Sequence, residues 1–230
     1  MSTAVKTTVP PLMEGQRLDQ PTFHERYEAM PPGTRAELIN RVVFMPSPAG
    51  YNHGIPLTGV LVWLDWYAEH TSGVETLTDA TVILDGWNEL QPDATLRIQP
   101  KHGGRTRNEG GYVAGAPELV VEVARSSRYV DLGPKQDEYE RAGVFEYVVR
   151  SVEPDEVIWY VLDGSQFVPL AADADGIHRS RAFPGLWLDA VALLAGDRAG
   201  VRAVLNRGMS TPEHAAFVAK LAAARVEPSA

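Results

Sequence analysis

The sequence predicts an α/β domain. Segments of helical periodicity and segments of strand periodicity alternate along the chain. One strand candidate, residues 118–124, is apolar almost throughout, which is typical of a strand covered on both faces. Hydrophobic residues make up 44% of the 230 residues, enough to fill a sizeable core.

The first third of the chain is predicted to form a short helix, a strand or hairpin, and a long helix. Residues 22–30 begin with a capping-box pattern at Thr22, which predicts a helix. Residues 36–45 are rich in β-branched and apolar side chains, which favours extended structure. Residues 52–70 carry apolar side chains at helical spacing, and we expect Pro56 to lie in the first turn of that helix.

Three strands and a loop are expected next. Residues 74–84 and 93–98 are strand candidates, and residues 118–124 form the apolar strand described above. Residues 101–111 lack an apolar pattern and are predicted to be a loop. A helix over 130–142 follows, closed by a glycine. The remaining candidates are strands at 144–150, 156–162, 167–170 and 177–183, and helices at 189–196, 198–207 and 211–225.

Composition excludes several classes of protein. The chain has no Cys, which rules out disulfides, thiolate metal sites and cysteine nucleophiles, and which fits a reducing compartment. No apolar run approaches the roughly 20 residues of a membrane span, and residues 1–11 lack the pattern of a signal peptide, so we expect a cytoplasmic protein. The net charge of −9 argues against a nucleic-acid binder, although charge near the site decides phosphate binding.

Asp93, Glu122 and Lys135 are the residues that point to chemistry. The two acids lie on neighbouring strand candidates, and the lysine lies on the helix that follows. If the strands pair, both carboxylates can face one hard cation such as Mg²⁺, with Mn²⁺ as an alternative. Such a cation assists phosphodiester hydrolysis, and a nearby lysine can orient water or offset phosphate charge. We therefore expect the two carboxylates to lie close together and the ammonium of Lys135 to point into the same pocket.

Each acid also has a simpler interpretation. Pro92-Asp93 is a common turn pair, so Asp93 could be a strand-end cap. Glu122 lies among valines and faces away from Val121 and Val123, which is costly unless the carboxylate is paired, metal-bound or on the outer face of an edge strand.

The motifs, taken in order, resemble the Uma-two family of restriction endonucleases, members of the PD-(D/E)XK nuclease superfamily. The most informative are Gln91-Pro92-Asp93-Ala94 and Pro117-Glu118-Leu119-Val120-Val121-Glu122-Val123. The others are Ala36-Glu37-Leu38-Ile39-Asn40, Pro46-Ser47-Pro48, His53-Gly54 and the segments 129–135, 139–147, 184–188 and 212–221.

The resemblance implies a restriction endonuclease-like core, a mixed central β-sheet flanked by helices, with an N-terminal β extension and C-terminal helices. It divides the chain into a disordered lead-in at 1–19, the nuclease domain at 20–190 and a helical extension at 191–230. It also implies Mg²⁺-dependent cleavage of DNA. The superfamily lysine stands two residues after the acid, where this chain has Ala124, so the resemblance assigns that role to Lys135.

Several further residues are candidates for the same site. The resemblance makes Glu37 a third carboxylate there, although it could be an ordinary strand residue. His53 could contact substrate phosphate or a metal-bound water, or simply pack at the start of its helix. Asp131 is expected to pair with Lys135 four residues later. The loop of Lys101, His102, Arg105 and Arg107 would contact a phosphate backbone, or be a solvated loop.

Other functions stay open. The chain could be a catalytically silent module that binds nucleic acid or protein on the same fold, or a generic α/β domain. A homodimer is expected because cutting both strands of a duplex takes two sites. Its interface could come from apolar residues of the C-terminal helices, which would otherwise pack on the parent domain: Leu205, Phe217, Val218 and Leu221.

Overall fold

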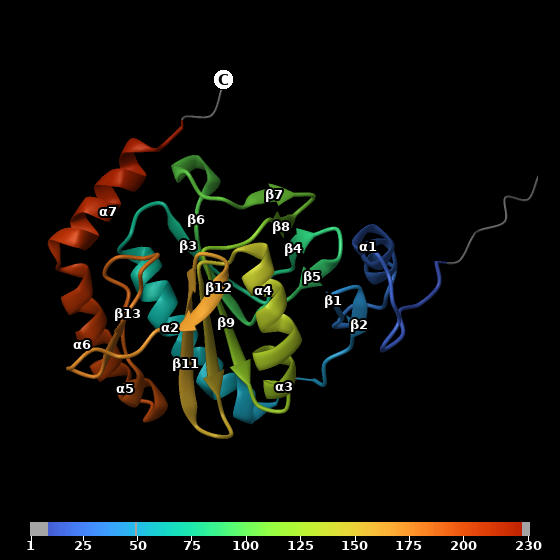
Figure 1. The fold of residues 1–230 in the computed structure, drawn as a ribbon, viewed down its shortest axis with the longest axis horizontal. Coiled ribbons are helices and arrows are strands. Elements are labelled where there is room, and N and C mark those ends of the chain that lie inside the picture. The colour runs from blue at the N-terminus through green and yellow to red at the C-terminus, as the bar shows by residue number, and fades with distance from the viewer. Residues whose placement is uncertain (1–8, 49, 227–230) are drawn as a thin grey trace, which may run out of the picture.

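A mixed six-stranded sheet forms the centre of the protein (Figure 1). The computed structural model describes residues 9–48 and 50–226. The strands follow the order β12 (Gln166–Pro169), β11 (Glu156–Asp163), β10 (Glu146–Ser151), β9 (Leu119–Ala124), β6 (Ala94–Ile98) and β3 (Val74–Thr78). β9 and β10 are parallel, whereas the other neighbours are antiparallel. The fold class predicted from the sequence is confirmed.

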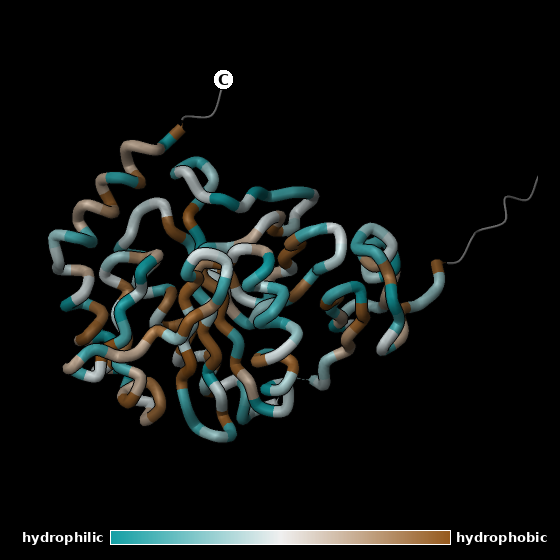
Figure 2. Tube along the Cα trace, in the orientation of Figure 1, coloured by the Kyte–Doolittle hydropathy of each residue, from teal (hydrophilic) through white to brown (hydrophobic). Residues whose placement is uncertain are grey.

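Helices cover both faces of this sheet. One face carries α2 (Tyr51–Glu69), α5 (Ala190–Leu194), α6 (Arg198–Met209) and α7 (Pro212–Ala223). The other carries α3 (Arg128–Val130), the π-helical turn η2 (Asp131–Lys135) and α4 (Gln136–Ala142). Side chains of β9 alternate between the two cores: Val121 and Val123 pack toward α2, and Val120 and Ala124 toward α4. Figure 2 accordingly shows hydrophobic segments gathered in the central strands.

A second sheet of short strands adjoins the first. Its order is β2 (Val42–Phe44), β1 (Glu37–Ile39), β5 (Asn88–Leu90), β4 (Val82–Asp85), β8 (Tyr112–Ala114) and β7 (Arg107–Glu109). The helix α1 (Gln20–Glu28) lies beside its β1–β2 end (Figure 1). The remaining elements are a 3-10 turn at η1 (Pro100–His102) and a hairpin of β13 (Ile177–Arg179) with β14 (Trp187–Asp189).

The expected strand over 74–84 is two strands that belong to different sheets. β3 pairs with β6 in the central sheet, and β4 pairs with β5 and β8 in the second. Asp79, at φ 49°, adopts a left-handed conformation between them and redirects the chain. β5, β7, β8 and β14 were not predicted, because strands of three residues leave almost no periodicity to detect.

Two details of the helices differ from expectation. Asp19, not Thr22, caps α1, because its carboxylate accepts the backbone N–H of Thr22 at 2.9 Å. Pro56 lies inside α2 beyond the first turn, since the helix begins at Tyr51. The helix expected over 130–142 is present, but it changes at η2, where Gly133 departs from helical dihedral angles.

The described parts of both chain ends pack on the rest of the domain, more closely than expected. Leu12 is buried and Leu18 N–H donates to the carbonyl of Arg41 at 2.8 Å, so the described part of the presumed lead-in is ordered against β1–β2; residues 1–8 lie outside the described residues. Leu205, Phe217 and Leu221 are buried in the main core and Val218 is half-buried. Because these side chains pack on the parent domain, the interface expected from them is wrong. Within 9–48 and 50–226, no helix has the length and hydrophobicity to cross a membrane.

Candidate active site

Strand register brings Asp93 and Glu122 together. β6 and β9 are antiparallel with Ala94 opposite Val121, so Asp93 lies opposite Glu122 one step further on. The backbone N–H of Asp93 donates to Glu122 Oε2 at 3.4 Å, and the N–H of Val123 donates to Asp93 Oδ2 at 2.7 Å. Both side chains line one cavity of about 350 Å³, as the sequence led us to expect.

Lys135 enters the same cavity from η2. Its Nζ lies 3.0 Å from Glu122 Oε1, 2.9 Å from Glu37 Oε1 and 3.8 Å from Asp131 Oδ1. Glu37 reaches the site from β1 of the second sheet, where its carboxylate also accepts the backbone N–H of Gln91 at 2.7 Å. The lysine therefore ties the helix to both sheets, and the expected pairing with Asp131 is present.

Tyr139 belongs to the site but was not predicted to. Its hydroxyl donates to Glu122 Oε1 at 3.0 Å, beside the ammonium of Lys135. The spacing of Asp131, Lys135 and Tyr139, four residues apart, could have indicated one shared helix face. The pocket wall also includes Gln91, Arg35 and Arg125, for which the sequence offers no comparable signal.

His53 holds the outer oxygen of Asp93. Its Nε2 lies 3.2 Å from Asp93 Oδ1, and the imidazole lines the cavity near the start of α2. The hydrogen bond to Asp93 raises the pKa of His53, although partial burial opposes that shift. The histidine is thus part of the site and not merely packed at the helix start.

The five predicted site residues therefore meet in one place. The simpler interpretation of Glu122 as an edge-strand residue does not hold, because β9 lies between β10 and β6 and all six of its residues are buried. Asp93 does stand at a strand boundary, immediately before β6, yet its side chain also lines the cavity.

Negative charge exceeds positive charge in this buried cluster. Four carboxylates, those of Glu37, Asp93, Glu122 and Asp131, are each less than 10% exposed, and Lys135 is the ammonium buried among them. Burial raises the pKa of Glu122 well above its usual range and that of Asp131 to about 6. Burial alone would lower the pKa of Lys135, but the carboxylates around it, Glu122 foremost, raise it, so the side chain is a cation.

The donor set fits a hard divalent cation. Asp93 and Glu122 offer carboxylate oxygens on one cavity wall, and the excess of carboxylates leaves negative charge that a dication would offset. Among residues 9–48 and 50–226, no group of three or more His, Asp or Glu is arranged to hold a metal by itself. Water and substrate oxygens would have to complete the coordination, as is common for Mg²⁺.

The basic loop expected beside the site lies elsewhere. His102 is buried and contacts the carbonyl of Leu221 in α7, and Arg107 pairs with Glu109. The guanidinium of Arg105 donates to the carbonyl of Gly143, and its backbone N–H donates to the carboxylate of Glu118. Glu118 immediately precedes β9, at the opposite end of that strand from Ala124. None of the four basic residues, Lys101 included, lines the cavity. Arg35 and Arg125 are the guanidinium groups there.

Comparisons with known proteins identify a family and a similar fold. A family model described as "Uma2: Putative restriction endonuclease" matches residues 22–191. A search of solved structures finds a protein titled a putative nuclease belonging to DUF820 from Anabaena variabilis ATCC 29413, at 14% sequence identity and a TM-score of 0.50. The match covers 64% of this chain and 82% of the other, and it supports the fold. No curated protein matches the chain.

Proposed function

Because the chain belongs to the Uma2 family, whose model spans residues 22–191, we propose that it is a nuclease that cuts DNA with the help of Mg²⁺ or Mn²⁺. One observation carries the proposal: two carboxylates from adjacent strands and one ammonium from the next helix line the same cavity. A purely structural ion pair would not need three buried carboxylates around one lysine and a fourth, Asp93, beside them.

Asp93 and Glu122 would hold the cation. When bound, the cation would stabilise negative charge that develops on the phosphate oxygens during hydrolysis. The N–H of Val123 fixes one oxygen of Asp93 and His53 holds the other, so this carboxylate keeps one orientation. Tyr139 does the same for Glu122.

Lys135 would act as a charged donor. Its raised pKa keeps the proton on Nζ, so the side chain can donate to an attacking water or a phosphate oxygen but cannot act as a base. Glu37 would be a positioning residue, because it holds Lys135 at 2.9 Å and is itself fixed by the N–H of Gln91. Arg35 and Arg125 line the cavity, where they also pair with Asp79 and Glu153, and would contact phosphates of the substrate.

The direct test is cleavage of supercoiled plasmid and of single-stranded DNA at low ionic strength in Mg²⁺ or Mn²⁺. Asp93→Asn and Glu122→Gln keep the size of each side chain but remove a charged ligand, so we expect activity to vanish. Lys135→Ala should retain the metal and lose on the order of 10²–10³-fold in rate, as single electrostatic donors do. Asp163→Asn changes an exposed aspartate at the end of β11 and should cut like the wild type.

The outcomes separate the proposal from its alternative. A metal-binding wild type that cuts no DNA at any salt concentration would favour a catalytically silent module on the same fold. Acid variants that cut as fast as the wild type would reveal a contaminating nuclease. Cutting both strands of a duplex would also call for two copies of the site, so we keep the homodimer as part of the proposal, and a dimer mass by light scattering would support it.

A further inference from the structure

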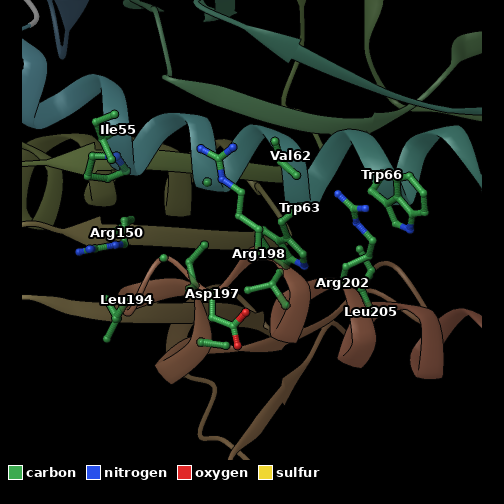
Figure 3. A pocket seen from close by; sticks show the side chains of 16 residues that line it. Ile55, Val62, Trp63, Trp66, Arg150, Leu194, Asp197, Arg198, Arg202 and Leu205 are labelled. Carbon is green, nitrogen blue, oxygen red and sulfur yellow. The ribbon is translucent and has the colours of Figure 1, made fainter.

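A second cavity, of about 190 Å³, lies between α2 and the α5–α6 helices (Figure 3). Its walls are mostly apolar and include two indole rings, Trp63 and Trp66 of α2, with Pro56 about two turns before Trp63. The absence of a side chain at Gly59 keeps this wall open, because a Cβ there would stand 3.3 Å from Leu193 Cδ1. Trp63 is 1% exposed, so the flat apolar groups open to a planar ligand are those of Pro56 and Trp66.

Positive charge borders the cavity on the α6 side. Figure 3 shows Arg198 extending from α6 toward α2, and Arg202 beside Trp66. The guanidinium of Arg202 stacks over the Trp66 ring at 4.6 Å from its centroid. Within the described residues, neither arginine has a carboxylate partner at ion-pair distance; Arg150 at the other end of the cavity is paired with Asp155 at 2.6 Å. Asp197 also lines the cavity, but Oδ1 of its carboxylate accepts the N–H of Gly200.

The second cavity and the candidate active site lie next to each other along α2. His53, which lines the active-site cavity, and Pro56, which lines the second, are three residues apart and neighbours on the surface of α2. Gly59, Trp63 and Trp66 extend the same stripe, and the axial distance from His53 to Gly59 is about 9 Å. Arg150 lies opposite Val123 in the β9–β10 pair, one residue along β9 from Glu122, and its side chain is on the α2 face of the sheet.

We propose that this cavity takes one unpaired nucleotide of the substrate strand, an inference that rests on the proposed nuclease function. A nucleotide combines a planar aromatic base, which the indole and proline surfaces suit, with a phosphate, which Arg198 and Arg202 suit. The volume accommodates a single base and not a base pair. The protein would therefore favour DNA that is single-stranded or locally unpaired near the scissile bond over an intact duplex.

Binding can be measured without metal or cleavage. Two-dimensional NMR of the tryptophan indole N–H groups reports on Trp63 and Trp66 during titration with thymidine 5′-monophosphate. Two control ligands are titrated in the same way: thymidine, which lacks the phosphate, and deoxyribose 5-phosphate, which lacks the base. We expect the nucleotide to shift the Trp66 signal and to bind more tightly than either half. Arg198→Gln and Arg202→Gln should each weaken nucleotide binding about five- to tenfold, the loss typical of a charge-assisted hydrogen bond. Arg198→Gln should leave thymidine binding unchanged, because Arg198 is not stacked on Trp66.

Matched variants separate this role from folding. Arg207→Gln alters another exposed arginine of α6 that does not line the cavity, and it should bind like the wild type. Trp66→Ala should weaken nucleotide binding about tenfold through lost stacking, whereas Trp66→Phe should restore most of it. Equal affinity for the nucleotide and deoxyribose 5-phosphate, or no effect of the Arg198 and Arg202 variants, would overturn the proposal.

Cleavage then distinguishes this inference from the proposed function. If the nuclease function and the nucleotide-binding cavity are both correct, the wild type cuts a 3′-overhang or bubble substrate faster than a blunt duplex. The double variant Arg198→Gln/Arg202→Gln should lose that preference and still nick plasmid DNA. Nucleotide binding without any metal-dependent cleavage would support the cavity and reject the nuclease. Cleavage without a preference for unpaired DNA would reject the cavity and leave the nuclease intact.

Discussion

Glu122 is the residue whose placement most needs an explanation. It is 3% exposed in a central strand, and burial raises its pKa well above the usual range. Glu37 and Asp131 add like charge around the shared Lys135. A carboxylate in such a place costs free energy unless a further cation joins it, and sites that sacrifice stability in this way are usually functional.

Glu122→Gln should therefore stabilise the metal-free protein. The substitution removes a carboxyl group whose charged form is disfavoured by burial, and Lys135 keeps Glu37 and Asp131 as partners. We expect the free energy of unfolding to rise by about 1–2 kcal/mol in urea titrations with chelator present. A loss of stability of similar size would mean that Glu122 is a structural ion-pair partner.

Lys135→Ala should have the opposite effect. Removal of the ammonium leaves three buried carboxylates, those of Glu37, Glu122 and Asp131, without their shared cation. The expected destabilisation is roughly 3–5 kcal/mol, measured by the same titration. As a control, Lys220→Ala at an exposed position of α7 should change the free energy of unfolding by less than about 0.5 kcal/mol. If Lys135→Ala were as stable as this control, the ion pairs of Lys135 would not contribute to stability.

Residue identity could be predicted where chemistry and spacing agree. Asp93 and Glu122 stood out as acids at strand candidates. The role of Lys135 followed from the family resemblance, because Ala124 stands where the superfamily has its lysine. Gln91 and Arg35 could not be found, because their place in the cavity depends on how the second sheet folds back.

At the scale of elements, long segments were predictable and short ones were not. The helix α2 and the strand β9 carry enough residues for their period to show, and both were placed to within a residue or two. β5 has three residues, and it exists because it pairs with β1 and β4, which is a property of the tertiary fold. The same contacts deliver Glu37 to the site.

The docking of α7 should weaken in acid. His214 is buried against Tyr67, with Nε2 2.9 Å from the hydroxyl of Thr71, and burial lowers its pKa below the usual 6.5. The folded state therefore favours the neutral ring, so stability is complete above about pH 6.5 and falls as the pH drops toward the lowered pKa.

Hydrogen exchange measures this effect locally. After correction for intrinsic rates, amides of α7 should exchange faster at pH 5 than at pH 7.5, relative to amides of β9, and His214→Gln should reduce that difference. Equal acid sensitivity of α7 in the wild type and in the variant would show that another group controls the docking.

At the scale of the whole molecule, the site lies where two sheets and a helix meet. Glu37 comes from the second sheet, Asp93 and Glu122 from the central sheet, and Lys135 from η2. The N-terminal β segment is therefore part of the site and more than an accessory to a nuclease core. The apolar residues of α6 and α7 belong to the main core. The sequence could not show this, because an apolar helix face can pack either on its own domain or on a second subunit.

The central claim is that Asp93 and Glu122 together hold a divalent cation. Crystals of the wild type soaked in Mn²⁺, with anomalous data collected near the manganese edge, test it most directly. The account predicts one anomalous peak in the active-site cavity, within roughly 2–2.5 Å of a carboxylate oxygen of each acid, and no such peak in Asp93→Asn. A cavity without a peak at saturating Mn²⁺, or a peak there that persists in Asp93→Asn, would contradict the claim.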